Sequence, residues 1–161
     1  MGFYGRCVLQ KSEVIAAVLD SLRSEFETYV TTSKNARSNG NDAQTKSEGK
    51  YDTRSTEENY LADGLAKHAA KARAAFEEFS AMTVLDFSES SSIRLSALIE
   101  LELGSENAWF LLAPAAGGLE VSIGGNNVTV LTPDSPLGLQ LLGKRLGEKT
   151  LQPASKILRV F

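Results

Sequence analysis

The chain contains few of the side chains that act as nucleophiles or as soft metal ligands. Cys7 is its only cysteine and His68 its only histidine, which excludes an internal disulfide and a cysteine-based zinc site. The two residues lie in unrelated sequence contexts, which argues against a Cys–His catalytic pair. Gly117-Gly118 and Gly124-Gly125 open no helix and are not followed by Lys-Ser/Thr, so neither pair is a phosphate-binding loop.

Three acidic residues, Asp52, Glu57 and Glu58, are the remaining candidates for chemistry. Carboxylate oxygens are the ligands that Mg²⁺ prefers. The same stretch also fits a helix start, because Ser55-x-x-Glu58 matches a capping box. Asp52 could turn or cap the chain just before it, and Glu57 suits the positive end of a helix dipole. From the residues alone, structural capping and metal binding both stay open.

The composition is that of an ordinary soluble globular protein. The chain has 161 residues, of which 42% are hydrophobic and 23% charged, and this length allows one medium domain or two small ones. The formal net charge is −3, whereas a free-standing duplex-DNA binder normally carries a basic surplus. No apolar run is long enough for a membrane span, and the N-terminus lacks the apolar core of a signal peptide. We therefore expect a cytoplasmic protein with no membrane partner.

Residues 1–82 carry two apolar stripes with helical spacing. Ser12 could cap the first helix, whose stripe fades after Val30, so we expect it to end or fray between about residues 36 and 48. The second stripe starts past Tyr51. The polar stretch between the stripes contains no proline, which predicts an antiparallel helical hairpin. The stripes consist of Ile15, Val18, Leu19, Leu22, Phe26, Tyr29, Val30 and Ser33, and of Leu61, Leu65, His68, Ala69, Ala72, Ala75, Phe76, Phe79 and Met82.

Residues 83–161 have a β-rich pattern that begins at Val84–Phe87. Alternation and turn residues predict about five strands, at 93–103, 109–112, 120–123, 128–131 and 157–161. Trp109 and Phe110 are expected to fill the core of this sheet. In the helical half, His68 lies on an apolar stripe, which favours a core or boundary histidine over a catalytic one.

A short helix is predicted between the last two of these strands. Ser135 can cap it, Pro136 suits its first position, and Gly143 can adopt the left-handed conformation that ends it. Apolar residues crowd the helix between these signals: Leu137, Leu139, Leu141 and Leu142. The residues alone therefore predict a buried strand that turns sharply into a short apolar helix.

This element also resembles a known family. Ser-Pro-Leu-Gly at 135–138, Leu-Leu-Gly-Lys at 141–144 and then Gly147 look like the C-terminal domain of the GreA/GreB transcript-cleavage factors and the related Rnk-type proteins. The resemblance implies an FKBP-like fold for residues 83–161. Together with the hairpin at 1–82, it implies the α+β architecture of that family and covers most of the chain.

The resemblance implies a function at RNA polymerase. In this family the hairpin enters the secondary channel of the bacterial polymerase, and acidic residues at its tip help to hold Mg²⁺ in the polymerase active site. On this basis Asp52, Glu57 and Glu58 would contact that metal, and Ser135, Pro136, Leu137 and Gly138 would dock on the polymerase. The chain would then be an accessory factor, not an enzyme. Nascent RNA would be an indirect partner, and no small-molecule substrate is expected.

The acidic motif departs from the family pattern. The family has Asp-x-x-Glu-Asn followed by Tyr, and Glu58-Asn59 matches its second half, but Ser55 stands where the first acid belongs. This favours a second hypothesis, in which the protein occupies the channel and competes there without stimulating cleavage. Lys67, Lys71 and Arg73 could touch RNA or polymerase, or simply form a solvated helix face.

Two hypotheses outside this function stay open from the sequence. The first is an FKBP-like peptidyl-prolyl isomerase, for which Trp109, Phe110 and Phe161 would have to line an aromatic pocket. The second is a plain coiled-coil adaptor, which would leave the element around Ser135 unexplained.

Overall fold

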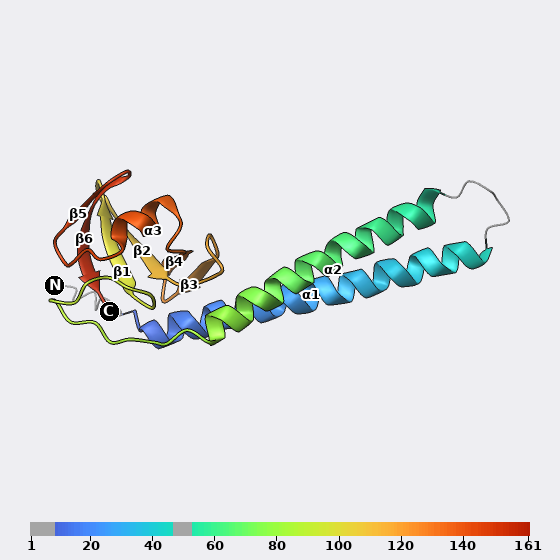
Figure 1. Cartoon of the computed structure of the whole chain (residues 1–161), viewed down its shortest axis with the longest axis horizontal. Coiled ribbons are helices and arrows are strands. Elements are labelled where there is room, and N and C mark those ends of the chain that lie inside the picture. The colour runs from blue at the N-terminus through green and yellow to red at the C-terminus, as the bar shows by residue number, and fades with distance from the viewer. Residues whose placement is uncertain (1–8, 47–52) are drawn as a thin grey trace, which may run out of the picture. The chain divides into compact units, whose positions relative to one another are not determined.

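The computed structural model of the protein describes residues 9–46 and 53–161 and has an α+β fold (Figure 1). Two long helices, α1 (Lys11–Lys46) and α2 (Thr53–Ser80), precede six strands and one short helix, α3 (Pro136–Leu141). Two compact units are formed. The residues up to Asp20 and Glu77–Phe161 make the sheet unit, and Ser21–Phe76 make the helical unit. The boundary that the sequence indicates between residues 82 and 83 follows the change from helix to strand pattern and stays a prediction.

In the helical unit, α1 and α2 lie side by side and run antiparallel (Figure 1). Contacts between the helices show this direction, because later residues of α1 contact earlier residues of α2. Arg23 lies over the Phe76 ring, Tyr29 stacks on His68, and Ser33 Oγ donates to the carbonyl of Ala62. The predicted antiparallel pair is confirmed. Apart from Leu22, the buried residues that the structure describes in this unit are small, namely Ser33, Ala36, Ala62, Ala69 and Ala72.

The buried stripe of α2 differs in detail from the prediction. Leu61 is 56% exposed, whereas Ala62 is fully buried. His68 is exposed too, and its ring stacks on Tyr29 with the centroids 5.4 Å apart. Alanines allow the two backbones to come close, and a larger side chain is then displaced to the edge of the interface. His68 is therefore a boundary residue.

Both long helices begin earlier than their predicted caps. α1 starts at Lys11, so Ser12 lies inside its first turn, and the carbonyl of Gln10 accepts from the amides of Glu13 and Val14. α2 starts at Thr53, so Ser55 is inside the helix and the predicted role of Ser55 as N-cap is wrong. α1 ends at Lys46, within the predicted range.

The sheet unit is built on one six-stranded mixed sheet in the order β3-β4-β2-β1-β6-β5. All neighbouring strands are antiparallel except β2 and β4, which are parallel. α3 covers one face, where Ile99, Leu101, Leu112, Leu141 and Ile157 form a buried core. The strands are β1 (Leu98–Leu103), β2 (Glu106–Leu112), β3 (Glu120–Ile123), β4 (Asn126–Leu131), β5 (Lys149–Leu151) and β6 (Ala154–Val160).

Two parts of the predicted strand pattern are wrong. The segment from Val84 to Ala97 contains no strand, and Ser96 has a left-handed φ of 71° and is buried. Its hydroxyl accepts from the amide of Leu85 at 2.8 Å, which fixes this irregular backbone. β5 was not predicted, because a three-residue strand with a single buried position carries almost no periodicity.

Within the described parts of the chain, none of the helices has the length and apolar character needed to cross a membrane.

Candidate functional site

The candidate docking corner lies where β4 turns into α3. Ser135 is the N-cap of α3, with φ −68° and ψ 151°, and Pro136 takes the first turn. The Ser135 hydroxyl accepts from the amide of Gly138 at 3.1 Å and donates to the carbonyl of Thr132 at 2.7 Å. Gly143 follows the helix with a φ of 78°. The predicted cap, first-turn proline and glycine stop are confirmed.

Gly138 is the most constrained residue of this corner. It is buried, and a Cβ built on it would lie 2.1 Å from the carbonyl oxygen of Thr132 and 2.7 Å from Ser135 Oγ. Real Cβ atoms do not come this close to a backbone oxygen, so no larger residue fits without moving the backbone. Ser135 and Gly138 therefore build the corner, and Leu137 is half-buried against the core. Of the four predicted docking residues, Pro136 is the exposed one.

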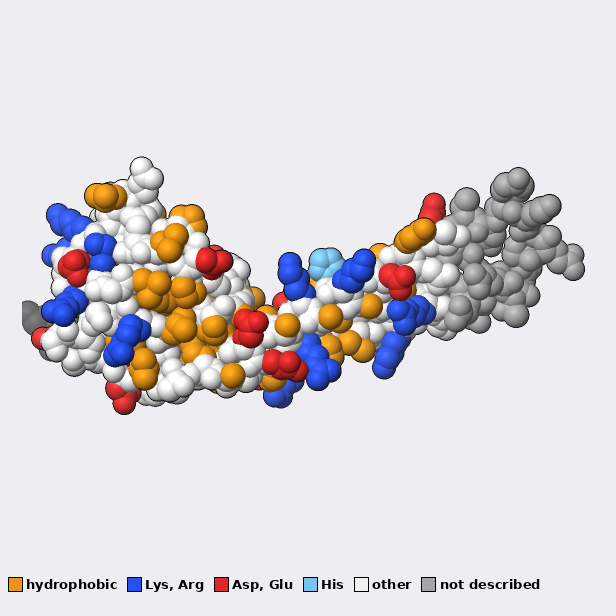
Figure 2. Space-filling model, in the orientation of Figure 1, with side chains coloured by type: hydrophobic (Ala, Val, Ile, Leu, Met, Phe, Trp, Pro, Cys, Tyr) orange, Lys and Arg blue, Asp and Glu red, His pale blue; other side chains and the backbone are white. Residues whose placement is uncertain are grey.

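The outer side of α3 is apolar. Leu139 is 64% exposed and Leu142 39%, and residues three apart share one side of a helix. Leu142 also lines a groove of about 650 Å³ together with Met82, Leu95 and Pro114. Figure 2 shows hydrophobic side chains gathered on this face of the sheet unit, beside α3. We call Pro136, Leu139 and Leu142 the α3 surface, and sequence reasoning had assigned Leu139 and Leu142 only to the helix.

Gln140 holds α3 against the turn between β5 and β6. Its carboxamide oxygen accepts from the amides of Leu151 and Gln152 at 2.8 and 3.2 Å, and its nitrogen donates to the carbonyl of Gln152 at 2.6 Å. These bonds satisfy backbone groups of an edge strand that would otherwise face water. They also hold the outer side of α3 in place. The sequence gives no signal for this clamp, because its partners lie in an unpredicted strand.

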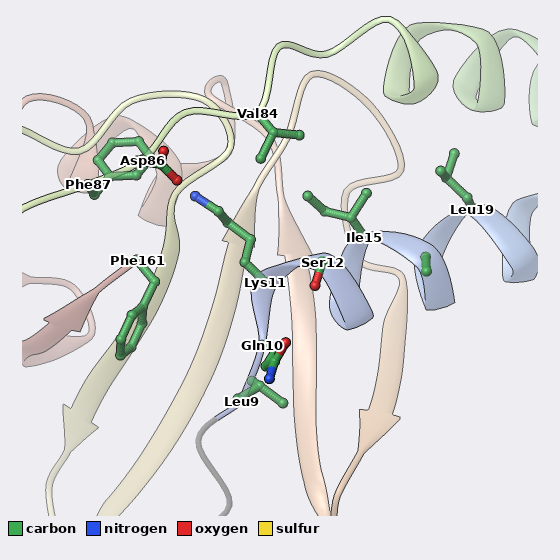
Figure 3. Close-up of a pocket in the computed structure, with 11 residues that line it drawn as sticks. Leu9, Gln10, Lys11, Ser12, Ile15, Leu19, Val84, Asp86, Phe87 and Phe161 are labelled. Atoms are coloured by element: carbon green, nitrogen blue, oxygen red, sulfur yellow. The ribbon is translucent and has the colours of Figure 1, made fainter.

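A second groove, of about 780 Å³, lies beside the start of α1 (Figure 3). Lys11 points across it toward Asp86, donates to the carbonyl of Leu85, and lies 4.9 Å from the centroid of the Phe87 ring. Burial lowers the pKa of Lys11 below its usual value, and the nearby carboxylate of Asp86 partly offsets this. The ammonium thus joins α1 to the segment that follows α2, which is a structural role.

The candidate metal residues are only partly described. Asp52 lies outside the described residues, as does the side chain of Glu58, whereas Glu57 is exposed in the first turns of α2. Among the described residues, no three Asp, Glu, His or Cys side chains come together as a metal site would require. Carboxylates suit Mg²⁺, but one exposed glutamate does not form a site by itself. The metal role of these acids stays a prediction.

Trp109, Phe110 and Phe161 are divided between the two faces of the sheet. Trp109 and Phe110 are consecutive in β2 and therefore point to opposite faces of the sheet. Trp109 is buried and lies 6.1 Å from Phe161 between ring centroids, whereas Phe110 packs against the core under α3. The predicted core role is confirmed for Trp109. Trp109, Phe110 and Phe161 therefore do not line one pocket together, as the isomerase hypothesis requires of them.

Comparison with known proteins gives likeness in structure only. No protein-family model matches the chain, and no curated protein does. Among solved structures, GreA factor homolog 1 (Gfh1) of Thermus thermophilus is 16% identical, covering 92% of this chain and 93% of its own, with a TM-score of 0.33. A structure described as the transcription factor Gfh1 is 18% identical over 89% and 93%, with a TM-score of 0.34.

Gfh1 of Thermus aquaticus is 17% identical over 88% of this chain and 92% of its own, with a TM-score of 0.32. At these identities and TM-scores the likeness assigns neither activity nor partner to this chain. What the chain itself shows is a helical pair followed by a mixed six-stranded sheet with one short capped helix.

Proposed function

We propose that the protein is an accessory regulator of bacterial RNA polymerase, of the GreA/GreB type, that acts in the cytoplasm. It binds the polymerase with the sheet unit and inserts the helical pair into the secondary channel. The order of elements supports this proposal, because a helical pair precedes a sheet with one short helix. The polymerase is the enzyme, and nascent RNA is met only through it.

The corner at Gly138 is the observation that carries the proposal. The resemblance of residues 135–138 to the GreA/GreB motif could arise by chance if each of these residues could be replaced independently of the others. Here the Thr132 carbonyl, the Ser135 hydroxyl and Gly138 depend on one another, because a side chain at 138 would collide with both oxygens. The motif that resembles the family is thus a built element of this fold, with its spacing set by contact.

The side chains that are exposed at this corner and on the neighbouring α3 surface are the proposed contacts with the polymerase. Ser135, Pro136, Leu137 and Gly138 form the corner, and the α3 surface beside it offers apolar side chains to a partner. Exposed leucines on a short rigid helix suit a protein interface, in which a few buried apolar anchors supply most of the binding energy. We propose that Pro136 and Leu139 contact the polymerase.

Transcript cleavage would depend on the acids near the start of α2. Asp52, Glu57 and Glu58 would supply oxygen ligands to Mg²⁺ held jointly with the polymerase, which activates the attacking water. One observation favours a second candidate, occupancy of the channel without cleavage: Ser55 replaces the first acid of the family motif. Both candidates share the same docking.

A polymerase halted in a backtracked complex separates the two candidates. The purified protein is added with Mg²⁺, and RNA length is followed on a gel. Shortened transcripts that can be extended again would establish cleavage. If the RNA stays intact, GreA is added as competitor. Suppression of GreA-dependent cleavage would then indicate a channel-binding inhibitor, and no effect in either step would contradict the polymerase proposal.

A further inference from the structure

Arg159 of β6 is held rigidly on the face of the sheet opposite α3. Its Nε donates to the carboxylate of Glu100, which is 4% exposed, and Asn107 donates to the other carboxylate oxygen at 2.9 Å. The guanidinium carbon lies 5.1 Å from the centroid of the Trp109 ring and 5.9 Å from that of Phe161. One half-buried ion pair and two aromatic rings therefore fix the plane of the guanidinium.

Among the residues that the structure describes, none accepts a hydrogen bond from the outer nitrogens of this guanidinium. The Arg159 side chain is 34% exposed, and in the described part of the chain only its Nε has a hydrogen-bond acceptor. Guanidinium carries five N–H donors, so the outer pair of nitrogens remains available. Two parallel donors in a fixed plane match the two oxygens of a carboxylate. Pre-organisation lowers the entropy lost on binding, because the side chain is already ordered.

Two lysines extend this positive region along β5 and β6. Lys156 lies opposite Glu102 of β1, and Arg159 lies opposite Glu100. Glu100 and Glu102 are two positions apart on one strand, so both cations face the same side of the sheet. Lys149 lies directly opposite Lys156, and both are exposed. Like charges in directly opposed positions destabilise a sheet. Glu102 offsets part of this repulsion at Lys156, whereas Lys149 lies on the edge strand and has Lys156 as its directly opposed residue.

We propose that Lys149, Lys156 and Arg159, the cationic face, bind an acidic segment of a protein partner, with one carboxylate held by both outer nitrogens of Arg159. A protein is favoured over nucleic acid for two reasons. The chain has a net charge of −3, which would repel a long polyphosphate. Trp109 is 7% exposed and cannot stack on a base. Where the partner is taken to be RNA polymerase, the inference rests on the proposed function.

Lys149→Glu tests the cationic face without damaging the fold. It replaces a like-charge pair by an attractive Glu–Lys pair, so thermal stability is expected to stay the same or rise slightly. Binding of the full-length variant to core RNA polymerase, measured by biolayer interferometry, is expected to weaken about fivefold, and Lys149→Glu with Lys156→Glu at least about tenfold. Arg159→Lys keeps the charge but removes the planar fork, and it should also weaken binding. Unchanged binding in all three variants would overturn the inference.

Trp109 provides a second readout that does not need polymerase. It is the only tryptophan of the chain, and its ring lies under the guanidinium of Arg159. A glutamate-rich peptide of about ten residues, titrated at low salt where screening is weak, is expected to change Trp109 emission in a saturable way. The change should be lost in the double lysine variant and weakened in Lys149→Glu. It should be kept in Lys71→Glu, which alters the net charge by the same amount as Lys149→Glu but lies on α2.

The two experiments distinguish failure of the inference from failure of the proposed function. If the peptide binds the cationic face but the wild-type protein does not bind polymerase, the proposed function fails and the acidic partner is another protein. If polymerase binds wild type and variants equally, the inference fails alone. An RNA oligonucleotide of equal charge that gives the larger Trp109 response would overturn the choice of a protein partner, and so would the absence of any response to the peptide.

Discussion

Replacing Gly138 by alanine is the sharpest test of the corner before α3. The new Cβ would lie 2.1 Å from the Thr132 carbonyl oxygen and 2.7 Å from Ser135 Oγ. Relief requires a backbone shift of roughly 1 Å, since such contacts are rarely closer than about 3 Å. Overpacking of this kind costs about 1–3 kcal/mol, and displacement of the Ser135 hydroxyl would cost about 1 kcal/mol more through the lost cap. We expect the sheet unit to lose about 2–4 kcal/mol of unfolding free energy.

Urea denaturation followed by Trp109 fluorescence measures this loss, because Trp109 is the only tryptophan and is buried in the sheet unit. Gly64→Ala is the matched control. Gly64 lies in α2, and outside the neighbouring backbone of its own helix no atom lies within 4 Å of an added Cβ. Alanine there should stabilise the helical unit by roughly 0.5–1 kcal/mol, as read by far-UV circular dichroism.

One result of the Gly138→Ala measurement would contradict this reasoning. A Gly138→Ala variant within about 0.5 kcal/mol of wild type, the usual range for a harmless surface change, would show that the corner accommodates a side chain. The close approach to the Thr132 carbonyl would then not be the reason why residue 138 is a glycine. The same variant should also bind polymerase more weakly, because α3 begins at this corner, and retention of full affinity would contradict docking by α3.

Four further predictions follow from the site. Ser135→Ala removes the N-cap and should cost about 0.5–2 kcal/mol in urea denaturation, whereas Ser135→Thr keeps a hydroxyl that both accepts from Gly138 and donates to Thr132 and should retain most of the stability. Gln140→Ala removes the clamp on the β5–β6 turn and should raise amide hydrogen exchange there, with β3 exchange unchanged as the internal control. Leu139→Glu changes an exposed residue, so stability should stay within about 0.5 kcal/mol while polymerase affinity falls about tenfold; equal affinity would exclude the α3 surface from docking. Asp52→Ala with Glu58→Ala should abolish rescue of backtracked complexes while binding persists, and unchanged rescue would rule out the metal role.

Much of the fold could be predicted from the sequence, because the signals are local. The start and stop of α3 depend on Ser135, Pro136 and Gly143, which lie within nine residues of one another, and each acts on neighbouring backbone. The two long helices follow from apolar spacing over many turns, which is a strong periodic signal. β3 was predicted with its bounds correct for the same reason, since turns limit it on both sides.

The errors arose where tertiary contacts overrule local pattern. Residues 93–97 alternate as a strand would, but Ser96 turns left-handed because its buried hydroxyl is bonded to Leu85. Ile93 instead exchanges backbone hydrogen bonds with Gly143 and Lys144 after α3. On α2, Ala69 and Ala72 are buried as predicted, but Ala62 is buried in place of the predicted Leu61, because small residues permit the closest helix contact.

The sequence by itself determined the helical pair, most of the strands and the capped corner of α3, because each depends on residues close together in the chain. Only the tertiary structure decided which leucines stay exposed on α3, how Gln140 clamps residues eleven and twelve positions away, and how Arg159 meets Glu100 across 59 positions. These contacts depend on strand order and register. Sheet register is set by the packing of the whole core, and a shift of one residue would move every side chain to the other face.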